Sequence, residues 1–270
     1  MSGLYGKELE LRSVLRNLNS AVVAYSGGVD SSLLLYLCHE ELGDSCIAVT
    51  ACSYSIPQRE IDSSVAFCRN YGIKQVFVDN DEFQIEGFAE NSPDRCYLCK
   101  SALFSKIRKL AAELSIDCII EGSNVDDDRD FRPGMRAILE HKVQSPLKDV
   151  GFTKADIREL SRKLNLPTAE KQSYSCLSTR FPTSEIITAE GLERVDKAEQ
   201  FLLGEGIKVV RVRSHKNLAR IETDEEGMKA LSDRELQLQV HDALTSMGFK
   251  FVSLDLAGYK TGSMNDFLLP

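Results

Sequence analysis

The segment Ser26-Gly27-Gly28-Val29-Asp30-Ser31-Ser32 combines the residue types that bind phosphate. Its glycines allow the backbone to approach a ligand closely and to adopt a positive φ. The N–H groups at the start of a following helix, together with the serine hydroxyls, donate hydrogen bonds to an anion. Asp30 can hold a divalent cation. No Gly-Lys-Ser/Thr follows, so the segment is not a Walker A loop. The alternative is an ordinary serine-capped strand–helix turn.

A second group of candidates consists of cysteines. Cys96 and Cys99 are three residues apart, directly after Ser92-Pro93-Asp94, which is typical of a helix start. Both thiols then share one face of the first turns, where the helix N-terminus favours thiolates. Cys176 lies far along the chain. Thiolates are the ligands of iron–sulfur clusters, and a redox pair, a zinc site or a coincidental spacing remains open.

Two arginines can recognise an anionic small molecule. Arg211 and Arg213 lie on the same face of a predicted strand, because side chains repeat every two residues. Two neighbouring guanidinium groups suit a phosphate or a carboxylate. Gly122 and Asn124 follow another predicted strand, at the end where a parallel sheet binds nucleotides. The alternative for each group is a solvated surface.

The elements around these residues indicate an α/β fold. Apolar runs at 21–25, 46–50, 75–78 and 118–121 read as buried strands, and they alternate with helical stretches at 8–18, 31–42, 57–71 and 93–114. Strands that are apolar throughout predict a parallel sheet covered on both faces, which is a Rossmann-like architecture.

The pattern changes near Pro182. A helix at 188–203, alternating and therefore half-exposed strands at 207–213 and 218–222, one helix at 224–247 and a strand at 249–254 predict a smaller α+β domain. The expected domains are residues 1–182 and 183–270.

Composition limits the class of protein. The 270 residues carry a net charge of −8 and eight cysteines, and no apolar run is long enough to span a bilayer. No apolar signal-peptide region is seen at the N-terminus. We therefore expect a cytoplasmic protein without a membrane partner. The acidic charge disfavours a nucleic-acid partner, and a homo-oligomer is expected.

The Ser26–Ser32 segment resembles the PP-loop of the ATP pyrophosphatases, which adenylate a substrate oxygen and release pyrophosphate. Two further segments resemble the LarE family, the sulfur transferases of nickel-pincer nucleotide assembly. They are Ser175-Cys176-Leu177-Ser178-Thr179-Arg180-Phe181-Pro182 and Leu254-Asp255-Leu256-Ala257-Gly258-Tyr259-Lys260-Thr261-Gly262-Ser263-Met264-Asn265. The resemblance runs over nearly the whole chain.

The resemblance implies ATP-dependent conversion of the carboxylates of pyridinium-3,5-biscarboxylic acid mononucleotide to thiocarboxylates. It implies ATP contacts at the PP-loop and the loop after the fourth strand, with Mg²⁺ at Asp30, and substrate contacts in the second domain. The expected ATP residues are Ser26, Gly27, Gly28, Asp30, Ser31, Ser32, Gly122 and Asn124, and the expected substrate residues are Arg180, Glu199, Arg211 and Arg213.

Within the family, one branch uses a single cysteine as a sacrificial sulfur donor, and Cys176 matches that position. A second branch resembles cluster-dependent enzymes, in which three cysteines hold a [4Fe–4S] cluster. The presence of Cys96 and Cys99 beside Cys176 favours the second branch. Three rivals remain: a PP-loop tRNA thiolation enzyme, an ATP-dependent amidotransferase or ligase, and a nucleotide-binding regulatory module without catalysis.

Overall fold

The computed structural model describes residues 3–129, 134–172, 174–260 and 264, and these form two compact units. The first unit contains the described residues up to Glu86 together with Asp94–Tyr174. The second contains Gly87–Pro93 and the described residues from Ser175 onward. This division falls earlier than the predicted boundary at residue 182. The Gly87–Pro93 segment joins the second unit because the side-chain amide of Asn91 donates to the carbonyl oxygens of Phe181 and Pro182, at 3.3 and 2.6 Å.

A four-stranded parallel sheet forms the centre of the first unit. The strands are β1 (Ala21–Ala24), β2 (Cys46–Cys52), β3 (Lys74–Asp79) and β4 (Ile119–Ile120), in the spatial order β3-β2-β1-β4. This arrangement confirms the predicted Rossmann-like α/β fold. The chain order reverses between β1 and β4, so the carboxyl ends of these two strands border the crevice where such sheets bind ligands.

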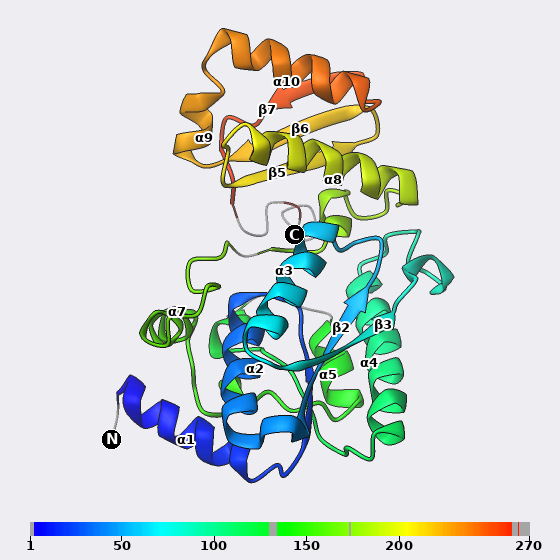
Figure 1. Cartoon of the computed structure of the whole chain (residues 1–270). Helices are drawn as coiled ribbons and strands as arrows, with labels where there is room; N and C mark the ends of the chain where they lie inside the picture. Colours follow the sequence, from blue (N-terminus) through cyan, green and yellow to red (C-terminus); the bar gives the residue numbers. More distant parts are fainter. Residues whose placement is uncertain (1–2, 130–133, 173, 261–263, 265–270) are drawn as a thin grey trace. The chain divides into compact units, whose positions relative to one another are not determined.

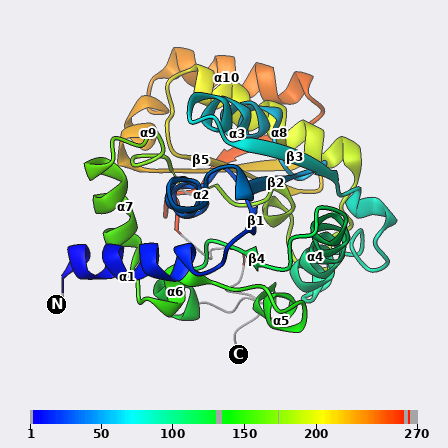
Figure 2. The same cartoon turned by 60° about the horizontal axis from the view of Figure 1, so that its bottom comes forward.

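Helices cover both faces of this sheet (Figure 2). Val23 of β1 packs into a core with α1 (Leu4–Arg16), α2 (Val29–Leu42), α3 (Gln58–Asn70), α6 (Pro146–Asp149) and α7 (Lys154–Lys163). Its neighbour Val22 packs into a second core with α4 (Arg95–Glu113) and α5 (Gly134–Glu140). Successive strand residues point to opposite faces, which explains why β1 must be apolar throughout.

Several helix boundaries differ from the sequence-based ones. α4 begins at Arg95 with Asp94 as its N-cap residue, so Pro93 lies before the helix and not within its first turn. The helices α5, α6 and α7 were not predicted. α7 begins with a capping box, in which the Thr153 hydroxyl accepts from the Asp156 N–H and the Asp156 carboxylate accepts from the Thr153 N–H.

The second unit is a smaller α+β structure, as predicted. Its sheet has the order β5-β6-β7, with β5 (Val210–His215) and β6 (Leu218–Thr223) antiparallel and β7 (Phe251–Leu254) parallel to β6. Its helices are α8 (Ala189–Gly204), α9 (Glu225–Ala230) and α10 (Arg234–Ser246), drawn from yellow-green to orange in Figure 1. Short 3-10 helices occur at Gly43–Ser45 (η1), Glu82–Gln84 (η2), Val125–Arg129 (η3) and Leu177–Arg180 (η4).

Two expectations for this unit were wrong. The single helix expected at 224–247 is two helices, because Asp233 caps a new helix by accepting from the Leu236 N–H at 2.9 Å. The strands expected to be half-exposed are largely buried. Arg211 and Arg213 expose only 8% and 5% of their surface. Arg213 pairs with Glu222, and Arg211 donates to the Val210 carbonyl oxygen.

Within the part of the chain that the structure describes, no helix has both the length and the apolar character needed to cross a membrane. Of the C-terminal segment singled out in the sequence, Thr261, Gly262, Ser263 and Asn265 lie outside the described residues.

Candidate active site

The PP-loop turns sharply from β1 into α2. Gly27 has φ +73°, a conformation that side chains other than glycine rarely adopt, and Gly28 is the N-cap residue of α2. The hydroxyl groups of Ser26 and Ser31 lie 3.0 Å apart, and the Ser31 hydroxyl donates to the Gly28 carbonyl oxygen at 3.2 Å. The serines therefore brace the loop, and the α2 N-terminus offers N–H groups for an anion.

The loop after β4 packs directly against the PP-loop. A Cβ atom placed on Gly122 would lie 2.9 Å from the Ser31 nitrogen, so only glycine fits there. Asn124 donates its side-chain amide to Asp30 at 3.4 Å. The structure thus brings together the candidates Asp30, Ser31, Gly122 and Asn124 from two distant parts of the sequence.

A buried carboxylate holds the loop after β4 in place. Glu121 accepts from the Ser145 hydroxyl at 2.5 Å and from the Ser123 N–H at 3.1 Å. Both serines are buried, and so is Glu121. A buried charge with several donors is satisfied, so the carboxylate serves to position Gly122 and Asn124.

Two lysines at the PP-loop were not identified from the sequence. Lys154, the first residue of α7, forms an ion pair with Asp30. Lys171 donates to the Gly27 carbonyl oxygen at 3.0 Å and pairs with Glu60 at 2.7 Å. The capping box at Thr153 could have revealed the helix that carries Lys154, whereas no local pattern marks Lys171. The loop therefore has cationic neighbours although it contains no lysine.

The donor set at this site fits a nucleotide phosphate. Asp30 is a carboxylate beside the helix N-terminus, and carboxylate oxygen is a ligand that Mg²⁺ prefers. The residues present are therefore suitable for ATP with Mg²⁺ at Asp30, although the individual contacts remain predictions.

Cys96 and Cys99 occupy the first turns of α4, as their spacing predicted. Cys96 is exposed, and its Sγ accepts from the Arg95 guanidinium at 3.4 Å. Cys99 is half-buried, and its Sγ accepts from the side-chain amide of Asn80 at 3.6 Å. Among the described residues no group of three or more Cys, His, Asp or Glu side chains is arranged to hold a metal ion. Cys176 belongs to the second unit, so the predicted cluster is not shown.

Cys176 lies directly before η4 in a turn organised by Arg180. Arg180 is fully buried and forms a bidentate ion pair with Glu199 at 2.7 and 3.0 Å. Its remaining Nη1 donates to the carbonyl oxygens of Ser175 and Cys176, at 3.0 and 3.4 Å, and to the hydroxyl groups of Ser175 and Thr179, at 2.8 and 2.9 Å. The predicted roles of Arg180 and Glu199 as substrate contacts remain predictions. Their observed contacts shape the Cys176 turn.

Arg211 and Arg213 lie on one face of the second sheet with Glu222 and Arg220. The register places Arg211 opposite Glu222 and Arg213 opposite Arg220. Arg213 pairs with Glu222 at 2.7 Å, and the Arg211 guanidinium lies 5.0 Å from the centre of the Tyr259 ring. Burial and the nearby Arg180 lower the pKa of Arg211. This polar face is suited to an anion, and its contact with substrate remains a prediction.

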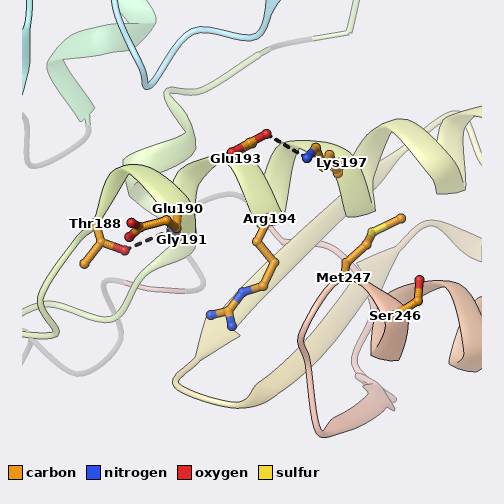
Figure 3. A pocket seen from close by; sticks show the side chains of 8 residues that line it. All are labelled: Thr188, Glu190, Gly191, Glu193, Arg194, Lys197, Ser246 and Met247. Carbon is orange, nitrogen blue, oxygen red and sulfur yellow. Dashed lines mark hydrogen bonds and ion pairs between the residues drawn. The ribbon is translucent and has the colours of Figure 1, made fainter.

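A surface pocket of about 520 Å³ in the second unit contains none of the predicted residues (Figure 3). Its charges are partly paired: Glu193 and Lys197 form an ion pair at 2.6 Å, and Arg194 donates to the Lys216 carbonyl oxygen at 3.0 Å. The lining residues are Thr188, Glu190, Gly191, Glu193, Arg194, Lys197, Ser246 and Met247.

The Rossmann-like sheet and its glycine loop define a PP-loop protein of the ATP pyrophosphatase type. Comparison with known proteins agrees, since the family model of NAD synthase matches residues 8–112. The chain is 33% identical to the pyridinium-3,5-bisthiocarboxylic acid mononucleotide synthase of Lactiplantibacillus plantarum, over 99% of this chain and 97% of that protein.

Two uncharacterized proteins are also similar. One, from Synechocystis, is 38% identical over 98% of this chain and 99% of its own length. The other, from Methanocaldococcus jannaschii, is 31% identical over 89% of this chain and 90% of its own length. Because the similarity to the synthase extends over both units, this chain belongs to the LarE family of ATP-dependent sulfurtransferases.

Proposed function

We propose that this protein uses ATP to activate the carboxylates of pyridinium-3,5-biscarboxylic acid mononucleotide and replaces carboxylate oxygen with sulfur. The observation that carries the proposal is the 33% identity to the Lactiplantibacillus plantarum synthase over 99% of this chain. A match of that extent includes the PP-loop, the Cys176 turn and the arginine face. The braced PP-loop, which contains Asp30, supports it independently.

The chemistry explains why ATP is required. A carboxylate is a poor electrophile, and attack of its oxygen on the α-phosphorus of ATP creates an acyl adenylate with AMP as the leaving group. The N–H groups at the start of α2 would stabilise the charge on pyrophosphate. Asp30 would hold Mg²⁺, which supplies further neutralisation of that charge.

For the sulfur source, we propose that Cys96, Cys99 and Cys176 hold a [4Fe–4S] cluster, which would supply a bound sulfide. The position of Cys96 and Cys99 at a helix N-terminus supports thiolate ligation. The alternative is sacrificial chemistry: the Cys176 sulfur attacks the acyl adenylate, and cleavage of its Cβ–S bond leaves dehydroalanine.

One anaerobic experiment tests both the proposed sulfur transfer and the proposed cluster. The purified chain is assayed for iron and for sulfur incorporation into the substrate by mass spectrometry, and about four irons per chain are expected for one cluster. Cys96→Ala should abolish multiple turnover, whereas Cys52→Ala, a half-buried thiol outside the proposed set, should not. An iron-free chain that remains active and converts Cys176 to dehydroalanine would disprove the cluster. Absence of sulfur incorporation by any preparation would disprove the function.

The tRNA thiolation rival makes a different prediction. It requires a salt-sensitive complex with tRNA, which the net charge of −8 opposes. A gel-shift titration should show no complex at physiological ionic strength. The amidotransferase or ligase rival predicts that replacing all three cysteines with alanine leaves turnover intact.

We also propose a homo-oligomer that acts in the cytoplasm with a small-molecule substrate and without a nucleic-acid or membrane partner. Light scattering after size-exclusion chromatography tests the oligomeric state directly. A monomer at the working concentration would contradict that part of the proposal.

A further inference from the structure

The segment that follows β7 was singled out in the sequence, but the proposed reaction gives it no role. Its described residues stay beside the end of β6. The Asp255 N–H donates to the Ile221 carbonyl oxygen at 2.9 Å. The Tyr259 N–H donates to the Thr223 carbonyl oxygen at 2.8 Å. Because the Asp255 carboxylate also pairs with Arg220 of β6 at 3.1 Å, the segment is held against the sheet at both of its ends.

A tight turn at Gly258 sets the place of Tyr259. Gly258 has φ +68°, and a Cβ atom there would lie 2.9 Å from the Thr223 carbonyl oxygen. The Gly258 N–H donates to the Asp255 carbonyl oxygen at 3.1 Å, and the Ala257 N–H donates to the Asp255 carboxylate at 2.9 Å. Both the positive φ and the close approach favour glycine. Together with the hydrogen bonds they fix where the backbone of Tyr259 begins.

The Tyr259 ring lies against the guanidinium group of Arg211. The Arg211 Cζ atom is 5.0 Å from the ring centroid, a distance at which a cation is attracted to an aromatic face. The Nη1 atom of Arg211 donates to the Val210 carbonyl oxygen at 2.8 Å. The ring and the carbonyl group together restrict the orientation of the guanidinium plane.

Arg211 belongs to a cluster of charged side chains in which arginines outnumber carboxylates. Glu222 lies opposite Arg211 in the register and binds Arg213 through one carboxylate oxygen and Arg220 through the other, at 2.7 and 3.0 Å. The described residues of the cluster are Arg180, Arg211, Arg213, Arg220, Glu199, Glu222 and Asp255. This excess of positive charge suits an anionic ligand.

We propose that Tyr259 is a positioning residue, which holds the Arg211 guanidinium group in the orientation that receives an anionic group of the substrate. The inference rests on the proposed function, which supplies a substrate with carboxylate and phosphate groups. A guanidinium group that is fixed before the substrate arrives loses less conformational entropy on binding. Its planar fork then donates paired hydrogen bonds to the anion. Tyr259 itself needs no contact with the substrate.

Substrate binding in the absence of ATP tests this role apart from turnover. Isothermal titration of the full chain with pyridinium-3,5-biscarboxylic acid mononucleotide is compared for the wild type and for variants of the segment. Tyr259→Leu should weaken binding about fivefold, the loss expected for one cation–π contact. Tyr259→Phe keeps the aromatic face and should bind like the wild type. Gly258→Ala should also weaken binding, because the new Cβ forces the turn that carries the ring to shift.

A double-mutant cycle tests whether the ring acts through Arg211. Arg211→Met should weaken substrate binding by itself. Adding Tyr259→Leu to that variant should cause no further loss, because the ring then has no guanidinium group to hold. A ring that touches the substrate directly would instead lower the affinity by the same factor whether or not the arginine is present.

A second probe identifies which anionic group Arg211 receives. Nicotinamide mononucleotide has the phosphate group of the substrate but neither carboxylate. If Arg211 receives the phosphate, Tyr259→Leu should weaken binding of both compounds. If it receives a carboxylate, only the substrate should lose affinity. Either pattern supports the positioning role.

Leu256→Ala is the matched control. Leu256 lies in the same segment, but its side chain is 88% exposed. The variant should leave substrate binding unchanged. The affinity for ATP should keep its wild-type value in every variant, because the PP-loop belongs to the other unit.

Two results would overturn the inference. The first is unchanged substrate affinity in Tyr259→Leu. The second is an equal loss from Tyr259→Leu with and without the Arg211 side chain. If the wild type itself does not bind the mononucleotide, the proposed function fails. A wild type that binds it as tightly as Tyr259→Leu refutes only the role of Tyr259, so the two failures are distinguished.

Discussion

Arg180 shows how one side chain can organise a whole turn of the chain. A guanidinium group has five N–H donors in a planar fork. In Arg180, two of the nitrogens donate to the Glu199 carboxylate. The third donates to oxygen atoms of Ser175, Cys176 and Thr179. Glu199 in turn accepts from the Val212 N–H at 3.0 Å, which links the turn to β5. The position of Cys176 therefore depends on a buried ion pair.

Replacing Arg180 with methionine should destabilise the protein strongly. The change leaves Glu199 buried without its guanidinium partner, and removing one member of a buried pair typically costs about 3–5 kcal/mol. Chemical denaturation of Arg180→Met against the wild type measures this loss. The double variant Arg180→Met/Glu199→Leu should recover part of it, because neither charge then remains buried.

Arg162→Met provides the surface comparison. Arg162 also pairs with a glutamate, Glu170 at 2.5 Å, but both side chains are more than half exposed. Exposed ion pairs contribute little, so the midpoint of denaturation should not move. Equal effects of the two arginine variants would contradict the role assigned to the buried pair.

The PP-loop and the loop after β4 act as one structural piece. Gly122 touches the backbone of Ser31 at the start of α2, and Asn124 reaches Asp30. Their parent strands, β1 and β4, are neighbours in the sheet. A larger side chain at Gly122 would therefore displace the start of α2.

Gly122→Ala should impair ATP binding more than it impairs folding. The new Cβ would lie 2.9 Å from the Ser31 nitrogen and 3.0 Å from its Cα, so the start of α2 must shift. We expect a raised KM for ATP, measured by pyrophosphate release. Gly204→Ala, where no atom lies within 4 Å of the new Cβ, should behave like the wild type. If the two variants have the same KM, the contact does not matter for ATP.

Several of the cysteines serve the core of the first unit. Cys38, Cys46 and Cys68 are buried in the core that α1 and α2 share with the sheet, and Cys118 packs against it. Burial raises the pKa of Cys68 to about 12. A hydrogen bond with Cys46 and burial raise the pKa of Cys38. The thiols of Cys38 and Cys68 therefore remain neutral at physiological pH, unlike ligands that must be thiolates.

Stability should therefore fall in alkaline solution. The unfolded chain ionises Cys68 from its ordinary pKa of 9.0, whereas the folded chain resists ionisation up to about 12. The stabilising contribution is complete below pH 9.0 and is lost as the pH rises between these two values. Denaturation of the wild type and of Cys68→Ala across this range measures the effect.

The informative quantity in that experiment is the change in the free energy of unfolding with pH. The cavity left by Cys68→Ala lowers stability equally at every pH, but the variant should lose less additional stability in alkali than the wild type. Identical slopes would mean that Cys68 does not titrate differently in the two states.

Local pattern predicted much of the architecture. Apolar strands alternating with helices correctly predicted a parallel sheet with two covered faces, because burial on both sides demands residues such as Val22 and Val23 in succession. The glycine loop was also predicted from the sequence, because its glycines indicate a backbone conformation that other residues rarely adopt. Gly27 has that conformation. The short helices between Gly134 and Lys163 were not predicted.

By itself, the sequence determined the fold class, the PP-loop and the thiols available for chemistry, since each depends on residue type and near-neighbour spacing. Only the tertiary structure decided which charges meet: Lys154 with Asp30, Lys171 with Glu60, and Arg180 with Glu199. The physical reason is that an ion pair requires only that two groups meet in space. Partners separated by more than 120 positions, as at the PP-loop, leave no periodic trace in the chain.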